Sequence, residues 1–346
     1  AHGDAAERGD RQLAPDEQLD HLRCAREAFA SADVEAVGFR CPYLRWSAGT
    51  LAALEQQGLI YDSSQALAWD VLDGTETESY CRVLDFYGAH PASEYLSLPQ
   101  VIGDLVRIPY SLPDDEALVD RLQLTDTQLM ARIWSAILRR TYELGELFTV
   151  GLHPERIALC GEALRAVLAE ARSLSPPVWI ARLGEIADWW RRRAAATYQV
   201  TKLAAGTFRL TVDGPPGVTV LSRGVKVEAP TEPWLGDYRR VLSTEFIFRG
   251  ERLPFVGVSP GSSPALVRFL QQQGYLIAQD GDAALYLHYE DFGLEDERAL
   301  LRRIEKGEWP LLRLARWPDG ARSALSITGD IDALTLWDYV LRVFSG

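Results

Sequence analysis

The sequence predicts an α/β protein in which most strands run parallel. Across residues 2–193, apolar runs of strand length alternate with segments whose apolar residues recur at helical spacing, and this alternation is typical of a parallel sheet covered by helices. Residues 197–248 are richer in β-branched residues and turn signals, which indicates a change of fold along the chain. With 346 residues, 47% of them apolar, the chain is long enough for two or three domains.

Apolar spacing predicts the elements of the first region. Two helices are expected, one over 17–30, where Leu19, Leu22 and Phe29 recur at helical spacing, and one over 125–144. Short strands are expected at 35–39, 105–108, 147–152 and 178–180.

The second half predicts smaller units. Phe208, Leu210 and Val212 alternate with polar residues, so residues 194–250 are expected to form a β-rich accessory domain with one buried face. Residues 251–316 predict a small α+β segment with helices over 265–273 and 294–305 and a strand pair around the turn at 280–282. Residues 317–346 predict a strand at 324–327 and then a helix.

Composition excludes several classes of protein. With 36 basic and 49 acidic residues the net charge is −13, which argues against a nucleic-acid partner, and the basic run 191–193 is expected to be a solvated helix end. There is no apolar run of eighteen residues, so no membrane span is expected. The four cysteines lack CxxC spacing, which excludes a zinc ribbon and a thioredoxin motif.

The first chemically suggestive segment is Gly-Phe-Arg-Cys-Pro-Tyr at 38–43. It follows a predicted strand and precedes a predicted helix, which places Arg40 at the carboxyl end of a strand, where α/β barrels build active sites. Taken alone, an Arg-x-Pro-Tyr string is more often a structural turn.

In this place, Arg40, Pro42 and Tyr43 resemble the Arg-x-Pro-aromatic motif of the NodB-type polysaccharide deacetylases, the fourth carbohydrate esterase family. The resemblance covers most of residues 1–193, which would form the barrel domain. It implies an incomplete or circularly permuted (β/α)7 deacetylase barrel that removes N-acetyl groups from a carbohydrate. The segments that continue it are 43–46, 50–54, 58–64, 107–115, 148–154 and 179–190.

His153 ends the predicted strand 147–152 and is similar to the histidine of the family's Leu-x-His motif, which supplies the general acid. Histidine suits proton delivery near neutral pH. Without the resemblance, a single histidine at a strand end is more often a core residue.

The family's metal motif, His-x-x-x-His, is altered in this chain. His2 fits its start, but Ala6 stands in the place of the second histidine, and loss of a ligand should weaken metal binding. Asp4, Glu7 or Asp10 could replace it. These residues are more typical of a solvated acidic loop.

Residues 323–332, which end in Thr-Gly-Asp-Ile-Asp, resemble the family's first motif, Thr-x-Asp-x-Asp. The resemblance implies that Asp332 and His2 hold a divalent metal, zinc foremost. This motif normally opens the barrel, so its position predicts either a circular permutation, in which the chain's end returns to the barrel, or a second, incomplete unit. The chain begins at Ala1 without a signal-like segment, and we expect the native N-terminus, with a barrel strand or two, to lie upstream.

The resemblance also implies the roles of four residues. Asp330 takes a proton from water, and Arg40 keeps Asp330 ionised and oriented. The backbone N–H of Tyr43 stabilises the oxyanion, and His153 protonates the departing sugar amine.

Two rival hypotheses come from other functional classes. Because of Ala6, the chain could be a catalytically degenerate barrel that binds a glycan or a protein partner; this hypothesis predicts no stoichiometric zinc. Alternatively, Trp234 and Tyr238 could form a stacking platform in a carbohydrate-binding module, although aromatic residues in such a region are more often core.

Overall fold

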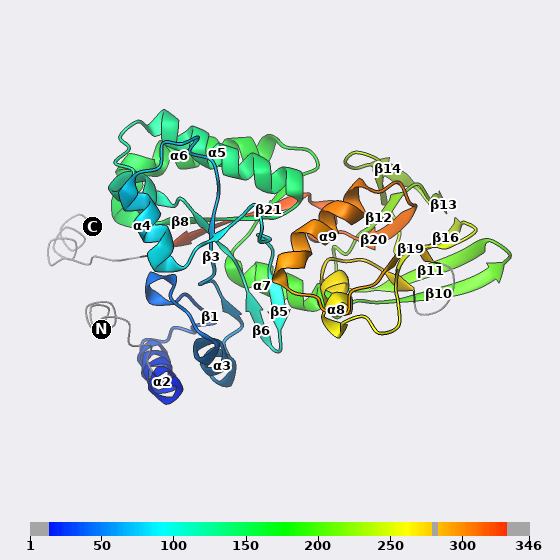
Figure 1. Ribbon diagram of the computed structural model, residues 1–346, viewed down its shortest axis with the longest axis horizontal. Helices are drawn as coiled ribbons and strands as arrows, with labels where there is room; N and C mark the ends of the chain where they lie inside the picture. The colour runs from blue at the N-terminus through cyan, green and yellow to red at the C-terminus, as the bar shows by residue number, and fades with distance from the viewer. Residues whose placement is uncertain (1–13, 279–282, 331–346) are drawn as a thin grey trace.

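The computed structural model of the chain describes residues 14–278 and 283–330, a mixture of helices and short strands in several small sheets (Figure 1). The first sheet lies near the N-terminus and has the order β1-β2-β6-β5, with the first three strands parallel and β5 antiparallel to β6. Its strands are β1 (Gly38–Phe39), β2 (Tyr61–Asp62), β6 (Leu105–Arg107) and β5 (Gln100–Ile102). Two helices pack together beside it, α2 (Pro15–Ser31) and α3 (Ala48–Gln56).

A second parallel sheet has β3 at its centre, between β4 and β7. Helix α4 (Glu78–Tyr87) connects β3 to β4, with Thr77 as its N-cap and Gly88 in the left-handed region at its end. The strands are β3 (Ala66–Ala68), β4 (His90–Pro91) and β7 (Tyr110–Leu112). A short helical segment, η2 (Ala117–Arg121), follows β7.

The third parallel sheet joins distant parts of the chain. Strand β21 (Ser323–Gly329) lies between β8 (Leu147–Leu152) and β9 (Val178–Ile180) and pairs in parallel with both. Every residue of β8 is buried, as expected for a parallel strand with both faces covered. The end of the chain therefore supplies the central strand of a sheet whose other strands precede residue 181.

Helices α5 (Thr127–Leu144), α6 (Ile157–Ser173) and α7 (Leu183–Ala194) complete this region. The carboxylate of Asp126 caps α5 by accepting from the N–H groups of Gln128 and Leu129, and Gly145 ends the helix with a φ of 70°. Trp134, Phe148 and Leu325 share one buried core, so α5 and β8 pack together with β21.

The second half is organised around three further sheets. One antiparallel sheet has the order β10-β11-β16-β13, and the other has the order β14-β15-β12-β20. Strand β20 comes from the predicted α+β segment and pairs with β12 from the predicted β-rich domain. The strands are β10 (Thr197–Ala204), β11 (Thr207–Asp213), β16 (Glu245–Arg249), β13 (Lys226–Glu228), β14 (Thr231–Pro233), β15 (Tyr238–Val241), β12 (Val220–Arg223) and β20 (Leu311–Leu314).

The remaining sheet is parallel and has β17 (Leu253–Val258) between β18 (Ile277–Ala278) and β19 (Ala283–Leu287). Two strands flank residues 280–282, as predicted, but they are not paired with each other, because β18 and β19 each pair with β17; residues 279–282 lie outside the described part of the chain. Helix α8 (Pro264–Gln272) supplies the crossover that a parallel connection needs, and α9 (Leu294–Lys306) follows β19.

The two halves share buried contacts. Trp190 of α7, Leu266 of α8 and Leu300 of α9 belong to one core cluster. Arg298 of α9 donates from Nη1 to Oε1 of Glu146 at 2.9 Å, in a salt bridge that is almost fully buried. Removing one partner of such a pair leaves an uncompensated buried charge, so α9 is firmly held against the start of β8.

Several sequence predictions are confirmed. The predicted strands 147–152 and 178–180 match β8 and β9 residue for residue, and α5 and α9 match the predicted helices within two residues. The predicted strand 35–39 is limited to its last two residues. None of the described helices is both long and apolar enough to cross a membrane. The described strands of the first region lie in three small sheets, so closure into a barrel stays a prediction.

Candidate active site

The loop after β1 is held by hydrogen bonds to the loop after β2. Arg40 donates from Nε to the carbonyl of Ser63 at 3.0 Å, and the N–H of Cys41 donates to Oγ of Ser64 at 2.8 Å. The Ser64 hydroxyl in turn donates to the carboxylate of Asp62, which is fully buried. Burial raises the pKa of Asp62, opposed by this hydroxyl and by the positive charges of Arg107 and Arg40.

Tyr43 lies in an unusual backbone conformation. Pro42 begins a short 3-10 helix, within which Tyr43 has a φ of 57° and a ψ of 20°. A non-glycine residue in this left-handed region costs about 1–2 kcal/mol, and such strain persists only where the surrounding structure holds it. Tyr43 is 43% exposed, and its ring lies edge-on to that of Phe86, with 5.7 Å between the ring centroids.

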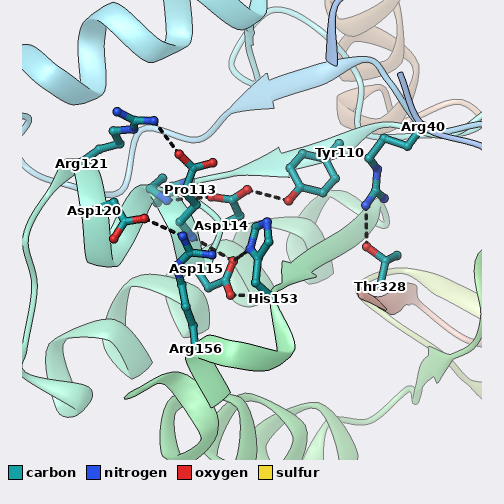
Figure 2. Close-up of polar contacts among 12 residues, drawn as sticks. Arg40, Tyr110, Pro113, Asp114, Asp115, Asp120, Arg121, His153, Arg156 and Thr328 are labelled. Carbon is teal, nitrogen blue, oxygen red and sulfur yellow. Dashed lines mark hydrogen bonds and ion pairs between the residues drawn. The ribbon is translucent and has the colours of Figure 1, made fainter. Parts of the chain in front are cut away.

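Arg40 reaches the third sheet. Its Nη1 donates to Oγ1 of Thr328 at 2.8 Å, and its guanidinium lies 4.4 Å from the ring centroid of Tyr110 (Figure 2). Tyr110 fits against β8 because residue 151 is glycine: a Cβ added there would lie 1.7 Å from the tyrosine oxygen. The Tyr110 hydroxyl donates to Oδ2 of Asp114 at 2.6 Å.

His153 follows β8 directly and is clamped by Asp115, a fully buried residue that follows β7. Oδ2 of Asp115 accepts from the backbone N–H of His153 at 2.6 Å, and Oδ1 lies 2.7 Å from Nδ1 of the imidazole (Figure 2). Oδ1 also accepts from the N–H of Glu116 at 2.8 Å. One carboxylate therefore fixes both the backbone and the ring of His153.

This clamp sets the charge of His153. The hydrogen bond to Asp115, assisted by the charge of the carboxylate, outweighs burial and the nearby charge of Arg156 and raises the pKa of His153 to about 9. Arg156 is itself paired with Asp120, with Nη2 2.6 Å from Oδ2. The imidazole is therefore protonated at neutral pH, the state that a general acid requires.

Asp114, beside Asp115, lies in a different environment. Burial raises its pKa to about 6, although the Tyr110 hydroxyl and the N–H of Ala117 stabilise its charge. Tyr110 thus contacts both Arg40, which follows β1, and Asp114, which follows β7.

Asp330 lies next to the histidine loop. Its N–H donates to the carbonyl of Leu152 at 2.9 Å, so its backbone extends the pairing of β21 with β8 up to the residue before His153. The side chain is exposed. Arg40 is bonded to Thr328, two residues before Asp330, and the described contacts of its guanidinium include none with Asp330.

The predicted metal ligands cannot be placed. His2 and Asp332, like Ala6 and the acidic residues near it, lie outside the described residues. Within residues 14–278 and 283–330, no cluster of three or more His, Cys, Asp or Glu side chains could hold a metal ion. The described donor set does not by itself fit a metal site.

No role for Asp115, Asp114, Tyr110 or Thr328 was predicted from the sequence. The available signal for Asp115 was the adjacent pair of carboxylates that ends the segment 107–115, which resembles the deacetylase family. The two aromatic residues that were candidates for a stacking platform both make internal contacts. Tyr238 is only 8% exposed, and Trp234 donates its indole N–H to the carbonyl of Gly320.

The site thus combines a protonated histidine with a solvent-exposed carboxylate, at the ends of two neighbouring parallel strands. A protonated imidazole can donate a proton, and a carboxylate can accept one. Comparison with protein-family models, with curated proteins and with solved structures found no match to the chain.

Proposed function

We propose that this chain is a hydrolase that removes N-acetyl groups from a carbohydrate. The observation that carries the proposal is the clamped, protonated His153 at the end of β8, beside Asp330 at the end of β21. Amide hydrolysis needs a proton acceptor for the attacking water and a proton donor for the departing amine. The resemblance of residues 38–43 and 323–332 to the NodB-type deacetylases supports the same assignment.

In this proposal, Asp330 accepts a proton as water attacks the acetamide carbonyl. The N–H of Tyr43 donates a hydrogen bond to the oxyanion of the tetrahedral intermediate. His153 presents Nδ1 to Asp115, so the transferred proton is the one on Nε2. Protonation of the sugar nitrogen breaks the C–N bond and releases acetate and a free amine.

A divalent metal, with zinc the first candidate, belongs to the proposal as a prediction, because His2 and Asp332 lie outside the described residues. If bound, it would act as a Lewis acid toward the acetamide and the water. Metal analysis of the purified chain tests this part separately from catalysis.

The test is release of acetate from N-acetylated oligosaccharides by the unaltered chain, Asp330→Asn and His153→Ala, with the zinc content measured in all three. We expect release by the unaltered chain and at least a hundredfold loss in each variant, since positioned acids and bases contribute about 10²–10⁴-fold. Equal background in all three would contradict the proposal. Binding of the oligosaccharide without turnover or stoichiometric zinc would favour the degenerate barrel that Ala6 suggests.

A further inference from the structure

A surface hollow lies beside the candidate active site, between α4 and η2. It has a volume of about 380 Å³ and is lined by Ser79, Arg82, Val83, Phe86 and Arg121; we name it the Phe86 hollow. The hydroxyl of Thr77 donates to the carbonyl of Arg121 at 2.7 Å, which ties the start of α4 to the end of η2. The hollow is of a size that small ligands occupy.

Two exposed aromatic rings extend this hollow toward the loop after β1. Phe86 is 38% exposed and lies edge-on to Tyr43, with an angle of 71° between the ring planes. The guanidinium of Arg45 lies 5.2 Å from the Phe86 centroid. Exposed rings of this kind offer apolar faces on which the C–H faces of a sugar can pack.

The arginines of the hollow are already paired with carboxylates. Arg121 donates from Nη2 to Oε1 of Glu116 at 2.6 Å, and Nη2 of Arg82 lies 3.6 Å from Oε1 of Glu78. Such pairs have little excess charge with which to attract an anion, and the net charge of −13 repels a polyanion. The guanidinium and carboxylate groups of these pairs are planar donors and acceptors that suit the hydroxyl groups of an uncharged sugar.

The hollow is connected to the catalytic groups at both ends. Glu116 accepts from Arg121 through Oε1 and from the Tyr87 hydroxyl through Oε2, and its own N–H donates to Asp115, which clamps His153. At the other end, Tyr43 contacts Phe86 and supplies the N–H that we propose as the oxyanion donor. A sugar chain whose acetamide lies at Tyr43 can therefore place a neighbouring ring over Phe86.

From this continuity we propose that Phe86 and Tyr43 form a subsite for an uncharged sugar ring adjacent to the one that is deacetylated. The substrate class is accordingly an uncharged oligomer or polymer of N-acetylated sugars, not a single sugar or a polyanionic glycan. This inference rests on the proposed function for its catalytic consequence, but binding to the subsite can be measured without turnover.

The test compares a tetramer and a monomer of N-acetylglucosamine as substrates for the unaltered chain, Phe86→Ala and Phe86→Trp. In Phe86→Ala, the ratio of kcat/KM for the tetramer to that for the monomer should fall about tenfold, the size expected for loss of one stacking ring. Phe86→Trp keeps an aromatic ring at this position and should keep the tetramer-to-monomer ratio of the unaltered chain. Phe29→Ala, which removes an exposed ring on α2, is the matched control and should leave the ratio unchanged.

Calorimetric binding of the tetramer separates failure of this inference from failure of the proposed function. Binding that Phe86→Ala weakens about tenfold, in a chain that releases no acetate, would support the subsite and contradict the deacetylase. No tetramer binding by the unaltered chain, an unchanged ratio in Phe86→Ala, or tighter binding of an acidic oligomer than of the neutral tetramer would overturn the inference.

Discussion

His153 and Asp330 end neighbouring strands, yet the protein holds them in different ways. The proposed acid half of the site, Asp115 and His153, is buried, and its carboxylate makes three hydrogen bonds. The proposed base half comprises Arg40, Thr328 and Asp330, and the Asp330 side chain is exposed. In the proposed mechanism, preorganisation is therefore concentrated in the acid half, where hydrogen bonds fix the imidazole.

The difference follows from where the chain supplies each half. Asp115 and His153 follow β7 and β8, two strands packed side by side in one continuous region of the chain. Asp330 is brought to the same edge by β21, which returns from the far end of the chain to pair with β8.

The largest effect is expected for Asp115→Asn. Without the carboxylate charge, the pKa of His153 should fall from about 9 toward its ordinary value of 6.5, so the acid is mostly unprotonated at pH 8. We expect acetate release at pH 8 to fall about thirtyfold, the loss in the protonated fraction of the imidazole, with the alkaline limb of the pH–rate profile moved to lower pH. Asp120→Asn, which removes a carboxylate paired with Arg156, is the control.

The hydrogen bond between His153 and Asp115 should also make the stability of the protein depend on pH. Because the pKa of His153 is raised in the folded state, the stabilisation is fully present below pH 6.5 and is lost as the pH rises through about 9. The difference in unfolding free energy between the unaltered chain and Asp115→Asn, measured with urea, should therefore be larger at pH 6 than at pH 9.5. A difference that grows with pH would show that the pKa of His153 is not raised.

Gly151→Ala tests the packing of Tyr110, which lies between Arg40 of the proposed base half and Asp114, the neighbour of Asp115 in the proposed acid half. The added Cβ would lie 1.7 Å from the tyrosine oxygen, so Tyr110 must leave its position between Arg40 and Asp114. We expect a loss of about 1–3 kcal/mol in unfolding free energy, together with reduced activity. Gly161→Ala in α6 is the matched control, because its Cβ would meet no atom closer than 3.7 Å; it should stabilise the helix slightly. Equal effects of the two would contradict this packing.

The smallest effect is expected in the base half. Thr328→Val keeps the side-chain volume but removes the hydroxyl that accepts from Arg40. Loss of this charge-assisted bond should lower the unfolding free energy by about 1.5 kcal/mol and should reduce turnover less than Asp115→Asn does. Denaturant titration and acetate release measure both, and a larger kinetic effect than that of Asp115→Asn would reverse the order of the two halves.

The sequence predicted local elements better than long-range neighbours. Strand β8 could be delimited because most residues of 147–152 are apolar, and His153 could be identified because it follows that run. Its partner Asp115 could not, since two carboxylates after a strand are equally typical of a loop, and the pairing depends on how β7 packs beside β8. The pairing of β20 with β12 escaped prediction for the same reason: periodicity identifies strands but not their partners.

The central claim, that His153 is the acid and Asp330 the base of one hydrolytic site, is tested most directly by changing the leaving group. Each variant is compared with the unaltered chain on an N-acetylated oligosaccharide and on an aryl acetate, whose phenolate leaves without a proton. His153→Ala should lose about a hundredfold more rate on the amide than on the ester, whereas Asp330→Asn should lose comparable rate on both. Equal losses on both substrates in His153→Ala, or an Asp330→Asn chain that retains full amide activity, would contradict the account.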